Sequence, residues 1–160
     1  MTNGSNRPPQ PRRKPLRLPH GSYQDPAGWY FVTICCSRKR GLLGTVARRD
    51  LVQDILCQTA TGHQVELAAY TILPDHLHFI GSAGRHGLMA FVRAFKSRAA
   101  VELRRRGMNS PLWQRSFFDH KLRSQESLRQ KCRYVWMNPL RRGLVGRPED
   151  YRWSGSLSSV

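Results

Sequence analysis

Two kinds of hydrophobic spacing follow one another along the chain and predict its secondary structure. The segments rich in aromatic and β-branched residues, or alternating between polar and apolar positions, are residues 29–36, 65–73, 76–80 and 117–122, and we expect strands there. Apolar residues instead recur every three or four positions in residues 46–61, 88–103 and 124–138, which predicts three helices. The predicted order is therefore βαββαβ, followed by a final helix.

The third predicted strand contains the most informative short motif. Pro74 and Asp75 form the turn of a tight hairpin, and the sequence His76-Leu77-His78 follows directly. Because side chains alternate across a strand, both imidazoles project from the same face, and Leu77 projects from the other. Two such histidines can give two nitrogens to one metal ion. A pair of this kind on an exposed sheet face also occurs without any ligand, so the spacing permits a metal site without establishing one.

The final helix has a second notable feature. The stripe that we expect to face the core consists of Leu128, Cys132, Val135 and Trp136. Tyr134 lies nearly opposite that stripe, and Asn138 shares its face one turn later. Pro139 is expected to end the helix, because proline removes the next amide donor. A functional Tyr-Asn pair and an exposed tyrosine followed by a cap-like asparagine both fit this pattern.

The charge of the chain indicates a polyanionic partner. Its 160 residues, enough for one domain, contain 27 Lys and Arg against 10 Asp and Glu, which gives a net charge of +17. Residues 85–147 hold sixteen of these basic residues and only three acidic ones. Such an imbalance is typical of nucleic-acid binding. The basic residues that we expect to contact nucleic acid are Arg93, Lys96, Arg98, Arg115, Lys121, Arg123, Lys131, Arg141 and Arg142.

The rest of the amino-acid composition indicates how the chain is divided into segments. Residues 1–22 are rich in proline and arginine and predict a disordered basic arm, residues 23–155 predict a single domain, which the resemblance described below identifies as catalytic, and residues 156–160 predict a short tail. The arm suits phosphate contacts and plain solubility equally. The four cysteines form no C-x-x-C pair, so we expect reduced thiols. There is neither a secretory signal nor an apolar run of about 20 residues, so we expect a cytoplasmic protein that does not cross a membrane.

Several motifs taken together resemble those of a known family. They are Leu73-Pro74-Asp75 followed by His76-Leu77-His78, then Phe95-Lys96-Ser97, Trp113-Gln114, Phe118-Asp119-His120, residues 134–145 and residues 148–151. In this order they resemble the REP-associated tyrosine transposases, which are bacterial single-tyrosine HUH nucleases. The resemblance covers most of residues 29–155. Cys35-Cys36 departs from it, because a more polar pair is expected in that strand.

The resemblance implies both a fold and a chemistry. The fold is a ferredoxin-like α+β domain, with an antiparallel sheet that presents the histidines and a later helix that carries the nucleophile. His76, His78 and Asn138 would bind Mg²⁺ or Mn²⁺, and Tyr134 would cut single-stranded DNA beside a REP hairpin and form a 5′-phosphotyrosine. A monomer is expected, and a swapped dimer stays open.

Two questions remain open from the sequence. A phenol has a pKa of about 10, and no residue stands out as its general base. Asp75 and the Asp119-His120 pair are candidates, whereas Lys131 would either stabilise phenolate character or contact a phosphate. The alternative functions are a non-catalytic nucleic-acid-binding module and a replication initiator of the HUH class. An initiator often carries a third histidine or paired tyrosines, and neither is evident here.

Overall fold

The computed structural model describes residues 20–157, so most of the predicted basic arm and the last three residues of the tail lie outside it. The strands are β1 (Trp29–Cys35), β2 (Leu67–Ile72), β3 (His76–Ser82), β4 (Phe118–Leu122) and β5 (Ser154–Leu157). The helices are α1 (Val46–Gly62), α2 (Leu88–Arg105) and α3 (Gln125–Arg141), and three short 3-10 turns cover His20–Gln24, Ser37–Lys39 and Pro148–Asp150. The predicted order βαββαβ with a further helix is confirmed. Strand β5 was not predicted, and it includes two residues that the sequence assigned to the tail.

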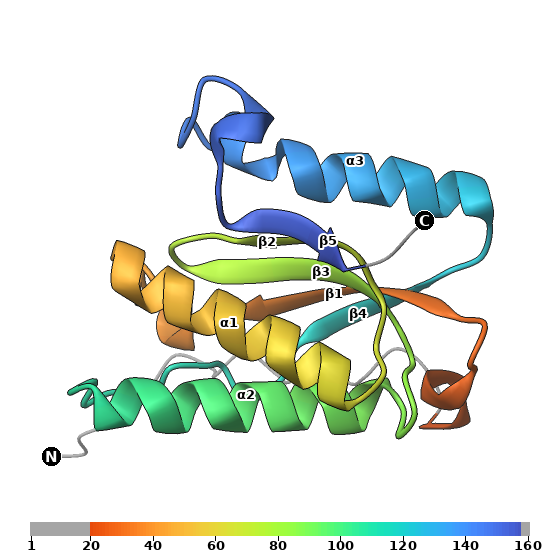
Figure 1. Cartoon of the computed structure of the whole chain (residues 1–160), viewed down its shortest axis with the longest axis horizontal. Coiled ribbons are helices and arrows are strands. Elements are labelled where there is room, and N and C mark those ends of the chain that lie inside the picture. The colour runs from red at the N-terminus through yellow and green to blue at the C-terminus, as the bar shows by residue number, and fades with distance from the viewer. Residues whose placement is uncertain (1–19, 158–160) are drawn as a thin grey trace, which may run out of the picture.

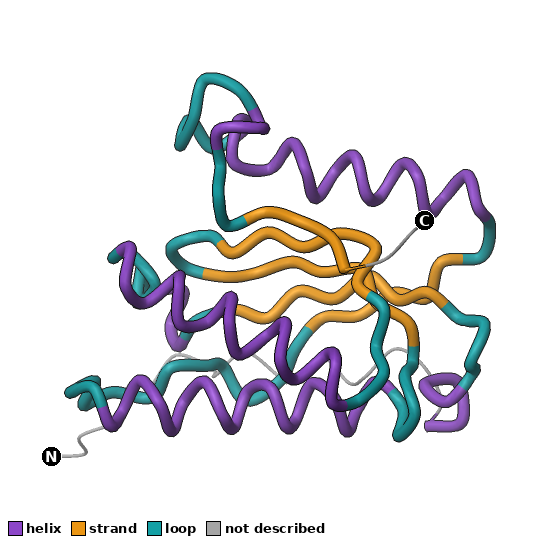
Figure 2. Tube along the Cα trace, in the orientation of Figure 1, coloured by secondary structure: helices purple, strands orange, loops and turns teal. Residues whose placement is uncertain are grey.

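All five strands form one antiparallel sheet in the order β4-β1-β3-β2-β5. Helices α1 and α2 cover one face of the sheet, and α3 lies across the other (Figures 1 and 2). Since β4 and β5 are the two edge strands, the segment that contains α3 connects opposite edges of the sheet. The fold is therefore α+β, as expected.

Each face of the sheet has its own hydrophobic core. The larger core, beneath α1 and α2, contains Leu77 and Phe79 of β3. The smaller core lies beneath α3, where Leu128 and Val135 of the helix pack with Ile80 of the sheet. Burial of these side chains stabilises both layers. The predicted alternation in β3 is confirmed, because Leu77 and Phe79 face one core and the two histidines face the side of α3.

Strand pairing places a threonine on each side of His78. In the register of β1 with β3, Thr33 lies opposite His78, and in the register of β2 with β3, Thr71 lies opposite it. Directly opposite residues of antiparallel strands project from the same face. His78 is thus bordered by two hydroxyl groups on the face that α3 covers.

Three details of the predicted helices are wrong. Val46, assigned to the apolar stripe of α1, is 52% exposed, and Trp136 of α3 is 37% exposed. The buried face of α3 includes Asn138 instead, so it is rotated away from Trp136. Pro139 lies inside α3, which continues to Arg141. A proline so close to the end removes only one backbone bond, and its own carbonyl accepts a hydrogen bond from Leu144 at 3.0 Å.

Two expectations, on the cysteines and on membrane-spanning segments, can be compared with residues 20–157. The four cysteines are all free thiols, as expected. Within residues 20–157, no helix combines the length and the apolar character that a membrane crossing requires.

Candidate active site

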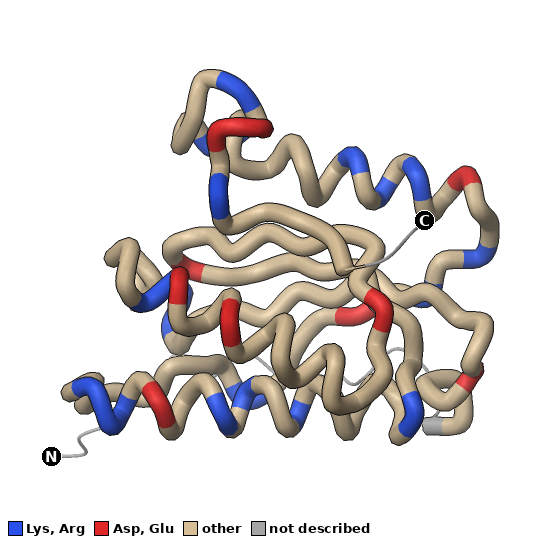
Figure 3. Tube along the Cα trace, in the orientation of Figure 1, with Lys and Arg blue, Asp and Glu red and all other residues tan. Residues whose placement is uncertain are grey.

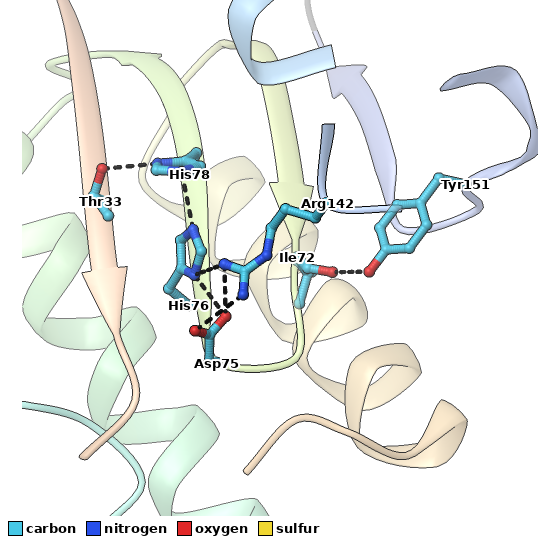
Figure 4. Close-up of polar contacts among 7 residues, drawn as sticks. All are labelled: Thr33, Ile72, Asp75, His76, His78, Arg142 and Tyr151. Atoms are coloured by element: carbon cyan, nitrogen blue, oxygen red, sulfur yellow. Dashed lines mark hydrogen bonds and ion pairs between the residues drawn. The ribbon is translucent and has the colours of Figure 1, made fainter. Parts of the chain in front are cut away.

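The Nε2 atoms of the His76 and His78 rings point toward each other (Figure 4). These two atoms lie 3.1 Å apart. The outer nitrogen of each ring is held by the protein: His78 Nδ1 lies 2.8 Å from Thr33 Oγ1, and His76 Nδ1 lies 2.7 Å from Asp75 Oδ1. Metal-binding histidines are commonly oriented through the second nitrogen in this way. Both Nε2 atoms are therefore directed at one place.

The environment of His78 keeps its imidazole neutral. The residue is only 6% exposed. Burial, followed by the positive charges of His76 and Arg142, lowers the pKa of His78 to about 3. A neutral imidazole is the form that can bind a metal ion.

Asp75 connects His76 to the helix on the same side of the sheet. Arg142, the C-cap of α3, places Nη1 3.2 Å from Asp75 Oδ1 and Nη2 3.4 Å from Oδ2. Arg142 Nη1 also lies 3.4 Å from His76 Nδ1. Burial raises the pKa of Asp75, but the hydrogen bond to His76 and the charges of His76 and Arg142 outweigh it and lower the pKa overall. The carboxylate is therefore ionised at neutral pH.

Helix α3 brings Tyr134 to the histidine face. Tyr134 is 36% exposed, and the centroid of its ring lies 5.9 Å from that of the His78 ring and 5.9 Å from that of the Phe31 ring. Lys131 Nζ is 5.3 Å from the centre of the Tyr134 ring, and the Arg141 guanidinium is 5.4 Å from it. One flank of the helix therefore carries a phenol and two cations beside the histidine pair.

Asn138 lies one turn after Tyr134 and is buried. Its side-chain nitrogen donates a hydrogen bond to the Tyr134 carbonyl oxygen at 3.1 Å, so the amide oxygen is the atom that could bind a cation. Within residues 20–157, no group of three His, Cys, Asp or Glu side chains could hold a metal. The possible donors for an ion here are the two imidazole Nε2 atoms and the Asn138 amide oxygen.

The predicted nucleic-acid contacts divide between the two sides of the sheet (Figure 3). Lys131, Arg141 and Arg142 are at the histidine site, whereas Arg93, Lys96 and Arg98 belong to α2 on the opposite side. Arg115 and Arg123 are exposed in loops.

Besides Arg142, which pairs with Asp75, three of the nine basic side chains are bound to oxygens of their own chain. Lys96 Nζ donates to the carbonyl oxygens of Gln114 at 2.7 Å and Arg115 at 3.2 Å, and burial lowers its pKa. Arg98 bonds to Thr59 Oγ1 at 2.8 Å and to Gln58 Oε1 at 3.1 Å. Lys121 pairs with Asp25 at 2.7 Å. These three therefore have structural contacts, and they do not join the group around Tyr134.

Among the candidate bases, Asp119 lies on the wrong face. It is opposite Val32 in the β1–β4 register, and Val32 belongs to the core beneath α1 and α2. Its carboxylate is buried and accepts a hydrogen bond from the Tyr23 hydroxyl at 2.9 Å. The sheet separates Asp119 from Tyr134. Its neighbour His120 lies opposite Phe31, is exposed, and belongs to the histidine face.

Comparisons with known proteins identify the family and the fold. The model of the family described as "Transposase IS200 like" matches residues 27–138, which include both histidines, the tyrosine and the asparagine. The REP-associated tyrosine transposase of Escherichia coli K12 is 23% identical over 128 residues, 79% of this chain and 74% of the relative. An uncharacterized protein of Haemophilus influenzae is 25% identical over 162 residues, 80% of this chain and 88% of the relative. The solved structure of a REP-associated tyrosine transposase bound to a REP hairpin has a TM-score of 0.68 at 23% identity, and covers 79% of this chain and 75% of its own.

Proposed function

The chain belongs to the family of IS200-like transposases, and from this premise we propose that it cuts and rejoins single-stranded DNA through Tyr134. The resemblance to REP-associated tyrosine transposases inferred from the motifs is confirmed at the level of the family. The observation that carries the proposal is the position of Tyr134, whose ring lies 5.9 Å from that of His78 in the same chain.

The proposed substrate is a single strand that contains a hairpin. A solved structure with this fold is that of a REP-associated tyrosine transposase bound to a REP hairpin, and the net charge of +17 suits a nucleic acid. Lys131 and Arg141 beside Tyr134, with the exposed Arg115 and Arg123, are the residues that we assign to phosphate contacts.

The proposed cofactor is Mg²⁺ or Mn²⁺, held by Nε2 of His76, Nε2 of His78 and the amide oxygen of Asn138. Support comes from the 3.1 Å separation of the two Nε2 atoms and from the contacts that hold both outer nitrogens. Mn²⁺ accepts nitrogen ligands more readily than Mg²⁺ does. A bound ion would offset charge on the phosphate oxygens and on the leaving oxygen.

In the proposed reaction, the Tyr134 oxygen forms a bond to phosphorus while the bond from phosphorus to the 3′-oxygen breaks. The phenol loses its proton to solvent, and the departing 3′-oxygen gains one. The products are a 5′-phosphotyrosine and a free 3′-hydroxyl, so the reaction is a transesterification that can run backwards to rejoin strands.

Replacing Tyr134 with phenylalanine tests this function. In the part of the chain described here, the Tyr134 hydroxyl makes no hydrogen bond, so Tyr134→Phe removes one partly exposed oxygen and leaves the fold intact. Wild-type protein with Mn²⁺ and a labelled hairpin strand should give a denaturant-resistant protein–DNA adduct, and the variant should give none. Tyr151 cannot replace it, because it is buried and its hydroxyl donates to the Ile72 carbonyl oxygen at 2.7 Å.

The assay also distinguishes catalysis from nucleic-acid binding alone. Cleavage by Tyr134→Phe would identify water as the nucleophile and refute the proposal. Wild-type protein that binds the hairpin but never forms an adduct would be a non-catalytic nucleic-acid-binding module.

A further inference from the structure

One ion pair connects helix α3 with the turn that leads into the histidine strand (Figure 4). Arg142 at the end of α3 lies 3.2 Å from Asp75, and the same carboxylate lies 2.7 Å from Nδ1 of His76. We propose that Asp75 and Arg142 are positioning residues: they form a clasp that orients His76 and fixes the end of the helix carrying Tyr134. This inference rests on the proposed function, because it assigns a role to residues around the proposed nucleophile and metal ligands.

The carboxylate side of the clasp acts on the His76 ring. With Nδ1 facing Asp75 Oδ1, the Nε2 atom of His76 is turned toward His78. The adjacent His78 is oriented by a different partner, the hydroxyl of Thr33 at 2.8 Å. A carboxylate behind a ligating histidine fixes the ring and raises its basicity. Asp75 therefore acts on a cation through His76.

The arginine side of the clasp acts on the helix. The hydrophobic core contacts of α3 come from Leu128 and Val135, and Asn138 and Pro139 are buried near its end, where Arg142 is the C-cap. The clasp thus adds an attachment at the end of the helix, two turns beyond Tyr134. Because a helix moves as a rigid element over so short a distance, fixing this end also restrains the position of Tyr134 over His78.

This role differs from the phosphate contact that the sequence suggested for Arg142. Its guanidinium already faces a carboxylate, whereas the neighbouring Arg141 is exposed and lies over the Tyr134 ring. Replacing a side chain that contacts a phosphate lowers the salt dependence of DNA binding by about one counterion. We therefore expect Arg141→Gln to reduce the slope of log affinity against log salt by about one, and Arg142→Gln to leave that slope unchanged.

The decisive experiment uses the full chain without DNA. Mn²⁺ affinity is measured by titration calorimetry, and amide hydrogen exchange is followed in residues 138–142. Asp75→Asn should weaken Mn²⁺ binding by about tenfold or more. Arg142→Gln should speed exchange in the last turn of α3 by about fivefold, which is the scale of a partly exposed ion pair. Arg142→Lys should restore most of the protection.

Arg147→Gln is the matched control. It removes the same charge from an exposed arginine, which pairs with Asp150 at 3.2 Å, so exchange in residues 138–142 should stay at the wild-type rate. The clasp is refuted if Arg142→Gln exchanges like this control, if Asp75→Asn binds Mn²⁺ like wild type, or if wild type binds no Mn²⁺. If Mn²⁺ binding and hydrogen exchange behave as expected but the wild-type protein forms no DNA adduct, the proposed function is refuted and the clasp is not.

Discussion

Thr33→Val should weaken metal binding through His78 without touching the histidine itself. Thr33 Oγ1 lies 2.8 Å from His78 Nδ1, and valine has nearly the same shape but cannot form that hydrogen bond. The buried imidazole then loses the group that fixes its ring. Loss of an outer partner of a metal-binding histidine typically lowers metal affinity by about 10- to 100-fold, or about 1.4–2.7 kcal/mol.

The same change should also lower the free energy of unfolding. His78 is only 6% exposed, so its Nδ1 would be left largely without a partner, at a cost of about 1–3 kcal/mol. Urea unfolding measures this cost, and calorimetric titration with Mn²⁺ measures the affinity. Both measurements use protein without DNA.

Thr71→Val provides the matched control on the neighbouring strand. Thr71 also lies opposite His78, but its hydroxyl accepts a hydrogen bond from Ser154 at 2.8 Å. The control should lose a comparable free energy of unfolding and keep wild-type Mn²⁺ affinity. If both valine variants bind Mn²⁺ equally well, the assignment of Thr33 as the orienting partner of His78 is wrong.

Three further predictions concern DNA, metal and fold. Hairpin affinity should fall about a thousandfold between 50 and 200 mM salt if six phosphates are contacted; a flat titration would exclude a phosphate-dominated interface. His76→Ala and His78→Ala should abolish cleavage while hairpin binding persists, because phosphate contacts supply the affinity. Asn138→Ala should cost less activity, because water can replace an amide oxygen. If both histidine variants cut at the wild-type rate with chelator present, the metal assignment is wrong. Leu128→Ala, at a position 1% exposed beneath α3, should lower the free energy of unfolding by about 2–5 kcal/mol, and an unchanged urea midpoint would contradict the packing.

Local patterns predicted the parts of the fold that depend on local geometry. The period of two in β3 assigned Leu77 to the core and the histidines to the opposite face, because alternation is a property of any strand. Helix α2 ends two residues before Gly107, whose φ of +89° suits the predicted stop. Tyr134 was singled out because it lies off the apolar stripe, and it does contact His78.

Features that depend on pairing between distant segments could not be read from the sequence. The contact of Thr33 with His78 arises from the register of β1 with β3, across 45 positions of the chain. Strand β5 is short and polar, and its position depends on pairing with β2. Trp136 is on the edge of the stripe, where a small rotation of α3 decides between burial and exposure.

The path of the chain between the two edge strands limits how α3 can be exchanged between molecules. The helix follows β4 at one edge of the sheet and precedes β5 at the other. For α3 to cross into a second copy, either β5 must separate from β2, or the connection after Arg141 must span both molecules. The first route also breaks the Tyr151–Ile72 hydrogen bond. Exchange of α3 between two copies would therefore cost either the β2–β5 pairing or a stretched connection, and this cost follows from the strand order alone.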